Sequence, residues 1–202
     1  MLIMKGEFPM ETKKVNLRFT VLLGIVAVAT VTRIFTPPLL GHPSNFSPID
    51  AIALFSGCYF AGRLTKFIVP LLSVWVGDVF INYMYLHKLM LFYDGFYWQY
   101  GCYVLMTLLG SLLAYRVTPV NLMSASLSSS ALFFVVSNFG VWVGSGMYPH
   151  TASGLVACYT AAIPFLSGTA IGDLIYSALF FGSFQWAGKR FPILALRHTS
   201  LK

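Results

Sequence analysis

Mostly apolar stretches along this chain alternate with short segments that hold most of the charges and prolines. A helix needs about 20 apolar residues to cross a hydrocarbon core about 30 Å thick. The second stretch is short and the last is long, so tilt and hydrophobic mismatch are expected. The pattern predicts six membrane-crossing helices, over residues 16–36, 48–62, 67–86, 97–115, 125–146 and 155–187.

The composition supports a membrane location. Of the 202 residues, 57% are apolar and only 9% are charged, and the mean hydropathy is +0.76. A soluble domain carries about a quarter charged residues, which help to cover its surface. These values exclude an ordinary cytoplasmic globule, a disordered chain and the usual kind of nucleic-acid-binding domain. The predicted fold class is therefore all-α, an integral membrane bundle of six helices.

The basic residues predict the orientation of the bundle. With six crossings and a cytoplasmic N-terminus, eleven of the 13 Lys and Arg fall on the cytoplasmic side, leaving only Arg33 and Lys88 outside. Cytoplasmic segments of membrane proteins are enriched in these residues. Both termini are thus predicted to be cytoplasmic, and the net charge of +7 needs no nucleic-acid partner. The predicted parts are a polar lead at 1–15, a six-span domain at 16–188 and a basic cytoplasmic tail at 189–202.

The predicted outer loops are more elaborate than the inner ones. They cover residues 37–47, 87–98 and 144–154, and they are rich in proline, glycine and aromatic residues. The first ends in Ser47-Pro48-Ile49-Asp50, which reads as a helix start with a serine N-cap and a carboxylate near the positive end of the helix dipole. The outside face is where an importer would receive a solute.

Two acids are predicted to lie at bilayer depth, where a charged side chain is costly and its presence requires an explanation. Asp78 and Asp173 fall near the middles of the third and sixth stretches, where a charge costs about 2.5–3.5 kcal/mol on insertion scales. Each is either a ligand-binding or proton-linked acid, or a buried acid bonded to a neighbouring helix. Pro70 and Pro164 precede them in similar strings, a pattern typical of an inverted pair of three-helix halves.

A candidate substrate site includes these two acids together with polar amides and aromatic residues. The amides and aromatic residues lie on the acid-bearing helices, in the outer halves of helices or in the outer loops. The predicted residues of the site are Asn45, Asp78, Asn82, Asn138, Trp142, Tyr148 and Asp173. Arg33 at the outer end of the first stretch is expected to snorkel to the headgroups, with pairing to an acid as the alternative.

The sequence contains no motif for a bound metal or nucleotide. Cys58, Cys102 and Cys158 lie inside apolar stretches and are expected to be buried thiols, although Cys102 and Cys158 are placed so that they could pair. No CxxC, HExxH, GxSxG or nucleotide-binding loop is present, so no cofactor or metal is predicted. Small residues at Ala53 and Gly57 mark a seam for internal packing or for docking of another membrane subunit.

Several strings resemble an uncharacterised family of small bacterial membrane proteins. They are Asn45–Gly57, Val69-Pro70-Leu71 with Asp78, Ser137–Trp142, and Tyr148-Pro149 through Cys158-Tyr159 and Ile163-Pro164-Phe165 to Gly172-Asp173. That family is similar in layout to the S-components of energy-coupling factor vitamin importers. The resemblance implies a multi-pass protein of the inner membrane that binds a vitamin or other micronutrient. It also implies docking to a transmembrane coupling subunit that carries ATPases.

Three functions follow as hypotheses. The first is a solute-binding protein for micronutrient uptake. The second is an intramembrane aspartyl protease that uses Asp78 and Asp173, because two buried carboxyls can share a proton. The third is a non-catalytic assembly subunit, which predicts a protein partner and no ligand.

Overall fold

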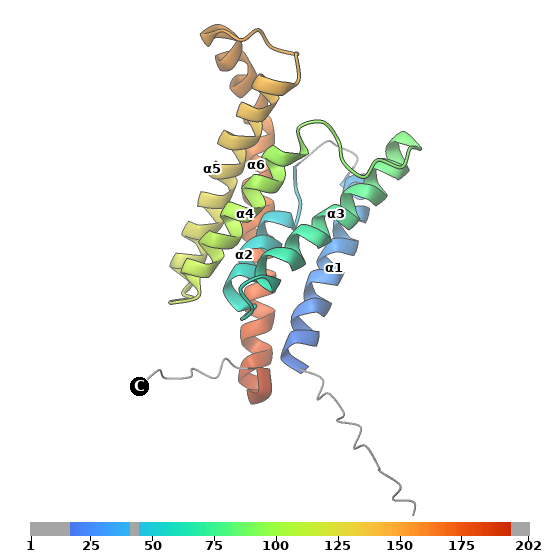
Figure 1. The fold of residues 1–202 in the computed structure, drawn as a ribbon. Helices are drawn as coiled ribbons and strands as arrows, with labels where there is room; N and C mark the ends of the chain where they lie inside the picture. The colour runs from blue at the N-terminus through green and yellow to red at the C-terminus, as the bar shows by residue number, and fades with distance from the viewer. Residues whose placement is uncertain (1–16, 41–44, 195–202) are drawn as a thin grey trace, which may run out of the picture.

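The computed structural model describes residues 17–40 and 45–194, which form a bundle of helices (Figure 1). The elements are α1 (Leu17–Leu40), α2 (Ile49–Tyr59), α3 (Thr65–Leu86), α4 (Phe96–Leu113), α5 (Pro119–Gly144), α6 (Ala152–Arg190) and a short 3₁₀ turn, η1 (Pro192–Leu194). Each predicted apolar stretch corresponds to one α-helix, and no strand occurs in the described ranges. The predicted lead at 1–15 and the tail residues 195–202 lie outside the described residues.

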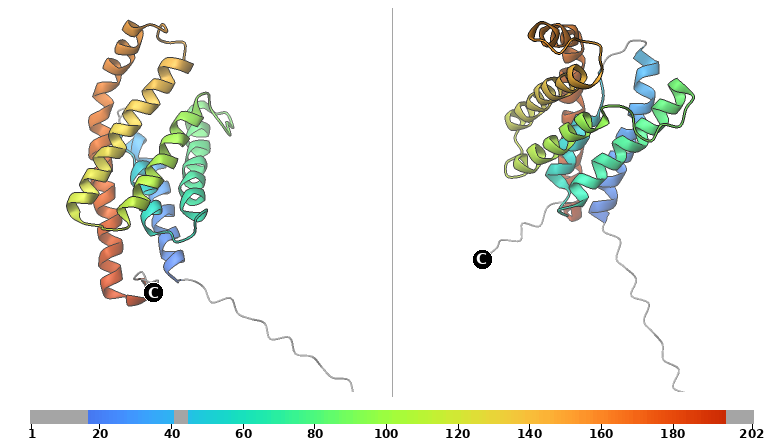
Figure 2. Two further views of the ribbon diagram at one scale, coloured as in Figure 1. Left: turned by 60° about the vertical axis from the view of Figure 1, so that its left-hand side comes forward. Right: turned by 45° about the horizontal axis from the view of Figure 1, so that its top comes forward.

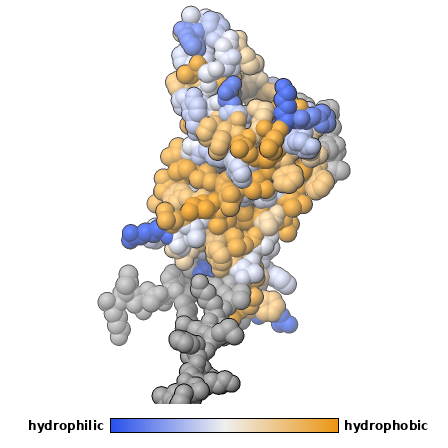
Figure 3. Space-filling view, turned by 45° about the vertical axis from the view of Figure 1, so that its right-hand side comes forward, coloured by the Kyte–Doolittle hydropathy of each residue, from blue (hydrophilic) through white to orange (hydrophobic). Residues whose placement is uncertain are grey.

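Four helices are long and apolar enough to cross a membrane: Leu17–Phe35, Thr65–Leu86, Pro119–Gly144 and Ala152–Arg190. Many large apolar side chains on these helices are exposed, among them Val28, Phe80 and Leu179. The face drawn in Figure 3 is apolar around its middle, with polar residues gathered toward its two ends. A soluble protein rarely exposes so large an apolar area, so this surface suits contact with lipid.

Helix α2 is too short to cross a membrane by itself. Its 11 residues span about 16 Å at 1.5 Å per residue, about half of a hydrocarbon core. The chain reaches α2 through an extended segment at residues 45–47, which runs alongside the long helices (Figure 1) and bends at Pro48 just before the helix. The stretch predicted as the second crossing thus consists of a non-helical part followed by a short helix. Membrane proteins tolerate such a break only where the irregular backbone is covered by protein or lines a cavity.

All residues of α2 are buried in the centre of the bundle. On one side α2 crosses α4 closely: a Cβ added at Gly57 would lie 2.0 Å from the carbonyl oxygen of Thr107, and one at Gly110 would lie 2.1 Å from that of Leu54. On the other side Phe55 packs edge-on against rings of α6, including Phe181. The small-residue seam predicted at Ala53 and Gly57 is thus internal packing, and both residues are fully covered within the chain.

Two helix boundaries differ from those predicted by four residues or more. Helix α1 continues through Leu40, four residues past its predicted end. Helix α5 begins at Pro119, six residues before the predicted start, because Thr118 accepts a hydrogen bond from Asn121 N and Pro119 occupies the first turn. Hydropathy alone missed this start, since Pro119, Asn121 and Ser124 interrupt the apolar residues there.

The α2–α4 crossing predicts a steric requirement for glycine. Gly57→Ala and Gly110→Ala each place a methyl group against the backbone of the facing helix, and we expect a loss of at least about 1–3 kcal/mol of stability from overpacking. Thermal unfolding in detergent measures the effect. Gly182→Ala in α6 is the matched control, because a Cβ there meets nothing within 4 Å. Equal melting temperatures for all three variants would contradict the close crossing.

Candidate functional site

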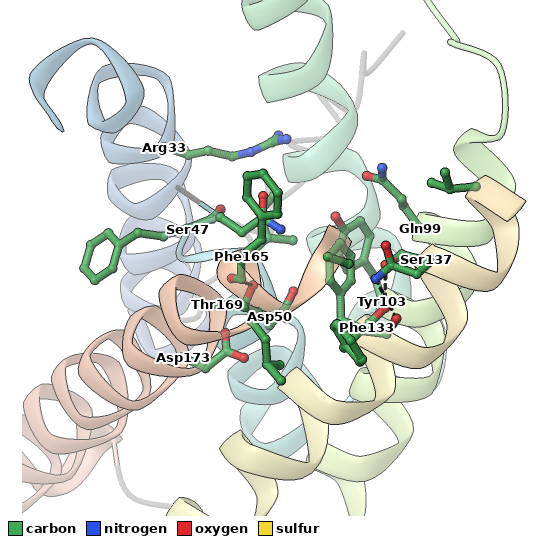
Figure 4. A pocket seen from close by; sticks show the side chains of 18 of the residues that line it. Arg33, Ser47, Asp50, Gln99, Tyr103, Phe133, Ser137, Phe165, Thr169 and Asp173 are labelled. Carbon is green, nitrogen blue, oxygen red and sulfur yellow. Dashed lines mark hydrogen bonds between the residues drawn. The ribbon is translucent and has the colours of Figure 1, made fainter. Parts of the chain in front are cut away.

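A cavity of about 420 Å³ lies where the extended segment meets α2. Its walls come from residues 45–50, from α4, α5 and α6, and from Arg33 of α1 (Figure 4). Tyr103, Phe133 and Phe165 supply aromatic surface. Asn45 is exposed at the rim, while Asp50 and Asp173 are buried. The cavity thus combines apolar and aromatic surface with about as many polar residues, and small-molecule sites likewise pair apolar walls with convergent polar groups.

The extended segment is held in place by α6. A Cβ at Gly172 would lie 3.1 Å from the backbone nitrogen of Ser47, so glycine lets the segment lie directly on the helix. The ring of Phe46 packs against that of Tyr176, with centroids 5.3 Å apart. Pro48, rather than the predicted Ser47, precedes the first helical residue, and no side chain caps the helix. The Ser47 hydroxyl is instead a cavity-lining group without a protein hydrogen-bond partner.

Two carboxyl groups meet at this cavity. Asp50 in the first turn of α2 and Asp173 of α6 both line the cavity, and their side chains are neighbours in Figure 4. Their exposed fractions are 6% and 1%. Ser130 of α5 donates a hydrogen bond to Asp173 Oδ2 at 2.5 Å. Neither Asp50 Oδ2 nor Asp173 Oδ1 has a hydrogen-bond donor among the described side chains.

Arg33 forms a second polar cluster beside the cavity. Its Nη2 donates to Asp78 Oδ1 at 2.5 Å, and its Nη1 donates to the Val74 carbonyl oxygen at 3.1 Å. Tyr100 of α4 donates to Asp78 Oδ2 at 2.9 Å. A Cβ at Gly77 would lie 2.7 Å from Arg33 Nη1, so glycine makes room for the guanidinium. The expectation that Arg33 snorkels is therefore wrong, because a buried acid lies within its reach.

The loop between α3 and α4 borders this cluster. Tyr93, outside the helices, donates to Gln99 Oε1 at 2.8 Å, and Gln99 lines the cavity. Burial raises the pKa of Tyr93, and the nearby charge of Asp78 raises it further. Tyr93 thus remains a neutral hydrogen-bond donor that fixes the Gln99 side chain at the cavity wall.

The seven predicted site residues fall into two groups. Asn45, Asn138 and Asp173 line the cavity, and Asp78 stands behind it through its bond to Arg33. Asn82, Trp142 and Tyr148 are not among the lining residues. Trp142 instead donates to the Pro149 carbonyl oxygen at 3.0 Å and serves the outer α5–α6 connection.

The two predicted acids are both buried in the bundle, as expected, but they belong to different clusters. Asp78 bonds to Arg33 and Tyr100, whereas Asp173 bonds to Ser130 and lies beside Asp50 (Figure 4). The described contacts include none between Asp78 and Asp173. The carboxyl pair on which the protease hypothesis rests is thus not assembled from these two residues.

Sequence reasoning missed Asp50 as a site residue. The position of Asp50 at a helix start was explained by its interaction with the helix dipole. No sequence pattern linked Asp50 to Asp173. Asp50 is, however, one of only six acids in the chain and is followed by a fully apolar run, and that combination was an available signal.

The cysteines and the metal-ligating side chains add no further centre. Cys58, Cys102 and Cys158 are buried free thiols, so Cys102 and Cys158 do not pair in this structure. Within residues 17–40 and 45–194, no three His, Cys, Asp or Glu side chains gather into a metal-binding group.

Comparison with known proteins finds one family. The model of a family of unknown function, DUF6580, matches residues 13–194, nearly the whole chain. No curated protein and no solved structure matches the chain. The expected kinship with an uncharacterised family is confirmed, while the likeness to vitamin-importer S-components stays a prediction.

The Arg33–Asp78 ion pair generates a test of stability. Removing one partner leaves the other charge buried, which costs about 3–5 kcal/mol in comparable sites. We expect Arg33→Met and Asp78→Asn each to lower the unfolding temperature in detergent, and the double variant to recover part of the loss. Asp94→Asn in the exposed α3–α4 loop is the control. Strictly additive losses in the double variant would show that the two side chains do not interact.

Proposed function

The chain belongs to the DUF6580 family of unknown function, and from the chemistry of its cavity we propose that it binds a small solute in the membrane for uptake. The observation that carries the proposal is a cavity with buried acids and aromatic walls at the break before α2. Its volume of about 420 Å³ lies within the range of 300–1,000 Å³ typical of ligand pockets.

The cavity lining suits an organic solute with both apolar and polar parts. The aromatic rings of Tyr103, Phe133 and Phe165 offer surface for a ring, and such contacts gain free energy from burial of apolar area. Asn138 and Gln99 offer amide groups. This mixture supports a vitamin or similar micronutrient as the transported class.

We further propose six crossings with both termini in the cytoplasm of a bacterial cell, in the inner membrane. Helix α1 begins and α6 ends at the same end of the bundle (Figures 1 and 2), which requires an even number of crossings. Six of the eight Lys and Arg of the described ranges lie in the segments at that end, and Arg33 and Lys88 do not. The six are Arg18, Arg63, Lys66, Arg116, Lys189 and Arg190. Such a bias is typical of the cytoplasmic side.

The energy for uptake has to come from outside this chain, because its sequence has no nucleotide-binding loop. A coupling subunit with ATPases, as in the energy-coupling factor importers, is one source, and an ion gradient is the other. Since the small-residue seam of α2 is covered by α4, a coupling subunit would dock on the lipid-facing helices instead.

Native mass spectrometry tests the proposed binding. Protein purified in mild detergent from its own host is expected to carry a bound small molecule of defined mass. Asn138→Leu, which alters the cavity wall, should reduce the bound fraction by at least about tenfold, equivalent to about 1.4 kcal/mol. Asn82→Leu is the matched control, because it changes an amide outside the cavity lining.

The outcomes of that experiment separate the hypotheses. Protein without any small molecule but with a stoichiometric protein partner would contradict solute binding and favour the assembly subunit. Co-purified ATPase subunits together with a ligand would support the energy-coupling factor arrangement. Equal loss of ligand from both variants would contradict the assignment of the cavity as the binding site.

Single cysteines test the orientation. Lys88→Cys lies in the exposed α3–α4 connection and Arg116→Cys in the exposed α4–α5 connection. In cells with a permeable outer layer and an intact inner membrane, a membrane-impermeant maleimide should label only Lys88→Cys. Arg116→Cys should react after permeabilisation. The three native cysteines are buried, so wild-type protein is the background control. Labelling of Arg116→Cys before permeabilisation would contradict the proposed orientation and indicate the opposite one.

A further inference from the structure

Packing between α2 and α6 does not explain why two acids, Asp50 and Asp173, lie side by side. Apolar side chains would pack α2 against α6 at lower cost, since buried charges lose hydration and need partners. Here Asp50 Oδ2 and Asp173 Oδ1 lack donors among the described residues, and both residues line the cavity. Because the side chains are more than nine-tenths buried, hydration by the surrounding solvent does little to stabilise their charges.

The charges around the cavity leave this pair uncompensated. Among the described residues, Arg33 is the cationic one that lines the cavity, and its guanidinium is bonded to Asp78. The Arg33–Asp78 pair is therefore neutral as a unit. Two carboxylates side by side in a buried site repel each other strongly, so the pair holds at least one proton or a cation.

We infer that the Asp50–Asp173 pair is the recognition point for a positively charged nitrogen of the solute, an amine or amidine carried on an aromatic ring. This inference rests on the proposed solute-binding function and narrows its substrate class. The ring lies against Phe133 and Phe165, and the cationic group lies against the two carboxyls. Charge-assisted hydrogen bonds of this kind are short and strong.

Binding exchanges one cation for one proton. Without a cation, one proton lies between the two carboxyls, as in other buried acid pairs. When the solute cation binds, this proton leaves to water, so that the charge of the site is conserved. One proton released per cation bound makes the affinity fall by up to about tenfold for each unit of decrease in pH.

The neighbouring ionisable groups do not replace the pair in this exchange. Those that face Asp50 among the described residues are Arg33 of α1 and Cys102 and Tyr103 of α4. Arg33 is paired with Asp78, and the Cys102 thiol and the Tyr103 phenol are buried. Ser130 of α5 donates to Asp173 without ionising.

Chemical labelling of the full chain in lipid nanodiscs tests this inference. Dicyclohexylcarbodiimide adds the O–H of a protonated buried carboxyl across its C=N bond, and the adduct rearranges to a stable N-acylurea. We expect one adduct on Asp50 or Asp173, located by peptide mass spectrometry. It should be lost in the Asp50→Asn, Asp173→Asn double variant and kept in Asp94→Asn. Absence of an adduct from both residues of the wild type overturns the shared proton and the inference.

Protection of the wild type then tests the ligand class. Benzamidine, a ring with a cationic amidine, should slow the labelling, and its half-protecting concentration should rise by up to tenfold from pH 7 to pH 6. Neutral benzamide and anionic benzoate should not protect. Protection by benzamide or benzoate equal to that by benzamidine, or no protection by benzamidine at millimolar concentration, overturns the inference.

This design separates the inference from the function on which it rests. Protection by an uncharged or anionic ring removes the cationic class but leaves solute binding in place. Failure of all three probes removes the inference, while solute binding itself stands or falls by the mass of the co-purified ligand. Because protection is measured on the wild type, it remains decisive if the double variant fails to fold.

Discussion

The need to cover polar backbone inside a membrane governs this structure. In hydrocarbon, an N–H or C=O group without a partner costs several kcal/mol, so a chain that enters a bundle in extended form must lie against protein. Residues 45–47 do so on α6, where Gly172 removes the side chain that would hold them away. The 11-residue α2 then begins in the middle of the bundle, and a cavity opens beside its first turn. The break in the helix and the candidate site are consequences of the same constraint.

The acids of the bundle divide into two clusters with opposite consequences. Asp78 is matched by Arg33 and Tyr100, and this cluster joins α1, α3 and α4 with little net charge. Among the described side chains, Ser130 donates to this second pair, and Asp50 and Asp173 place two acids at an aromatic cavity. We expect the first cluster to stabilise the bundle, and the second is the proposed recognition point for the solute. This division leads to a specific class for the proposed substrate, namely solutes that carry a positive charge.

Much of the architecture could be predicted from the sequence. Hydropathy located all six helices, and the cost of burying charge correctly placed Asp78 and Asp173 in the interior. The exceptions have local causes. The polar start of α5 was hidden from hydropathy, although Thr118 and Pro119 mark it. Asp50 was given a role at a helix start, because its place beside Asp173 depends on tertiary packing between distant parts of the chain. Arg33 was assigned to the headgroups for the same reason. The inverted repeat stays a prediction.

The most direct measurement is a high-resolution density map of the protein in a lipid nanodisc, prepared from membranes of its own host. The account predicts an extended chain at residues 45–47, a short α2, and density of a small molecule between Tyr103, Phe133 and Phe165, with its polar end at Asp50 and Asp173. A continuous helix through residues 45–47, or a cavity closed by protein side chains or filled by a lipid tail, would contradict it.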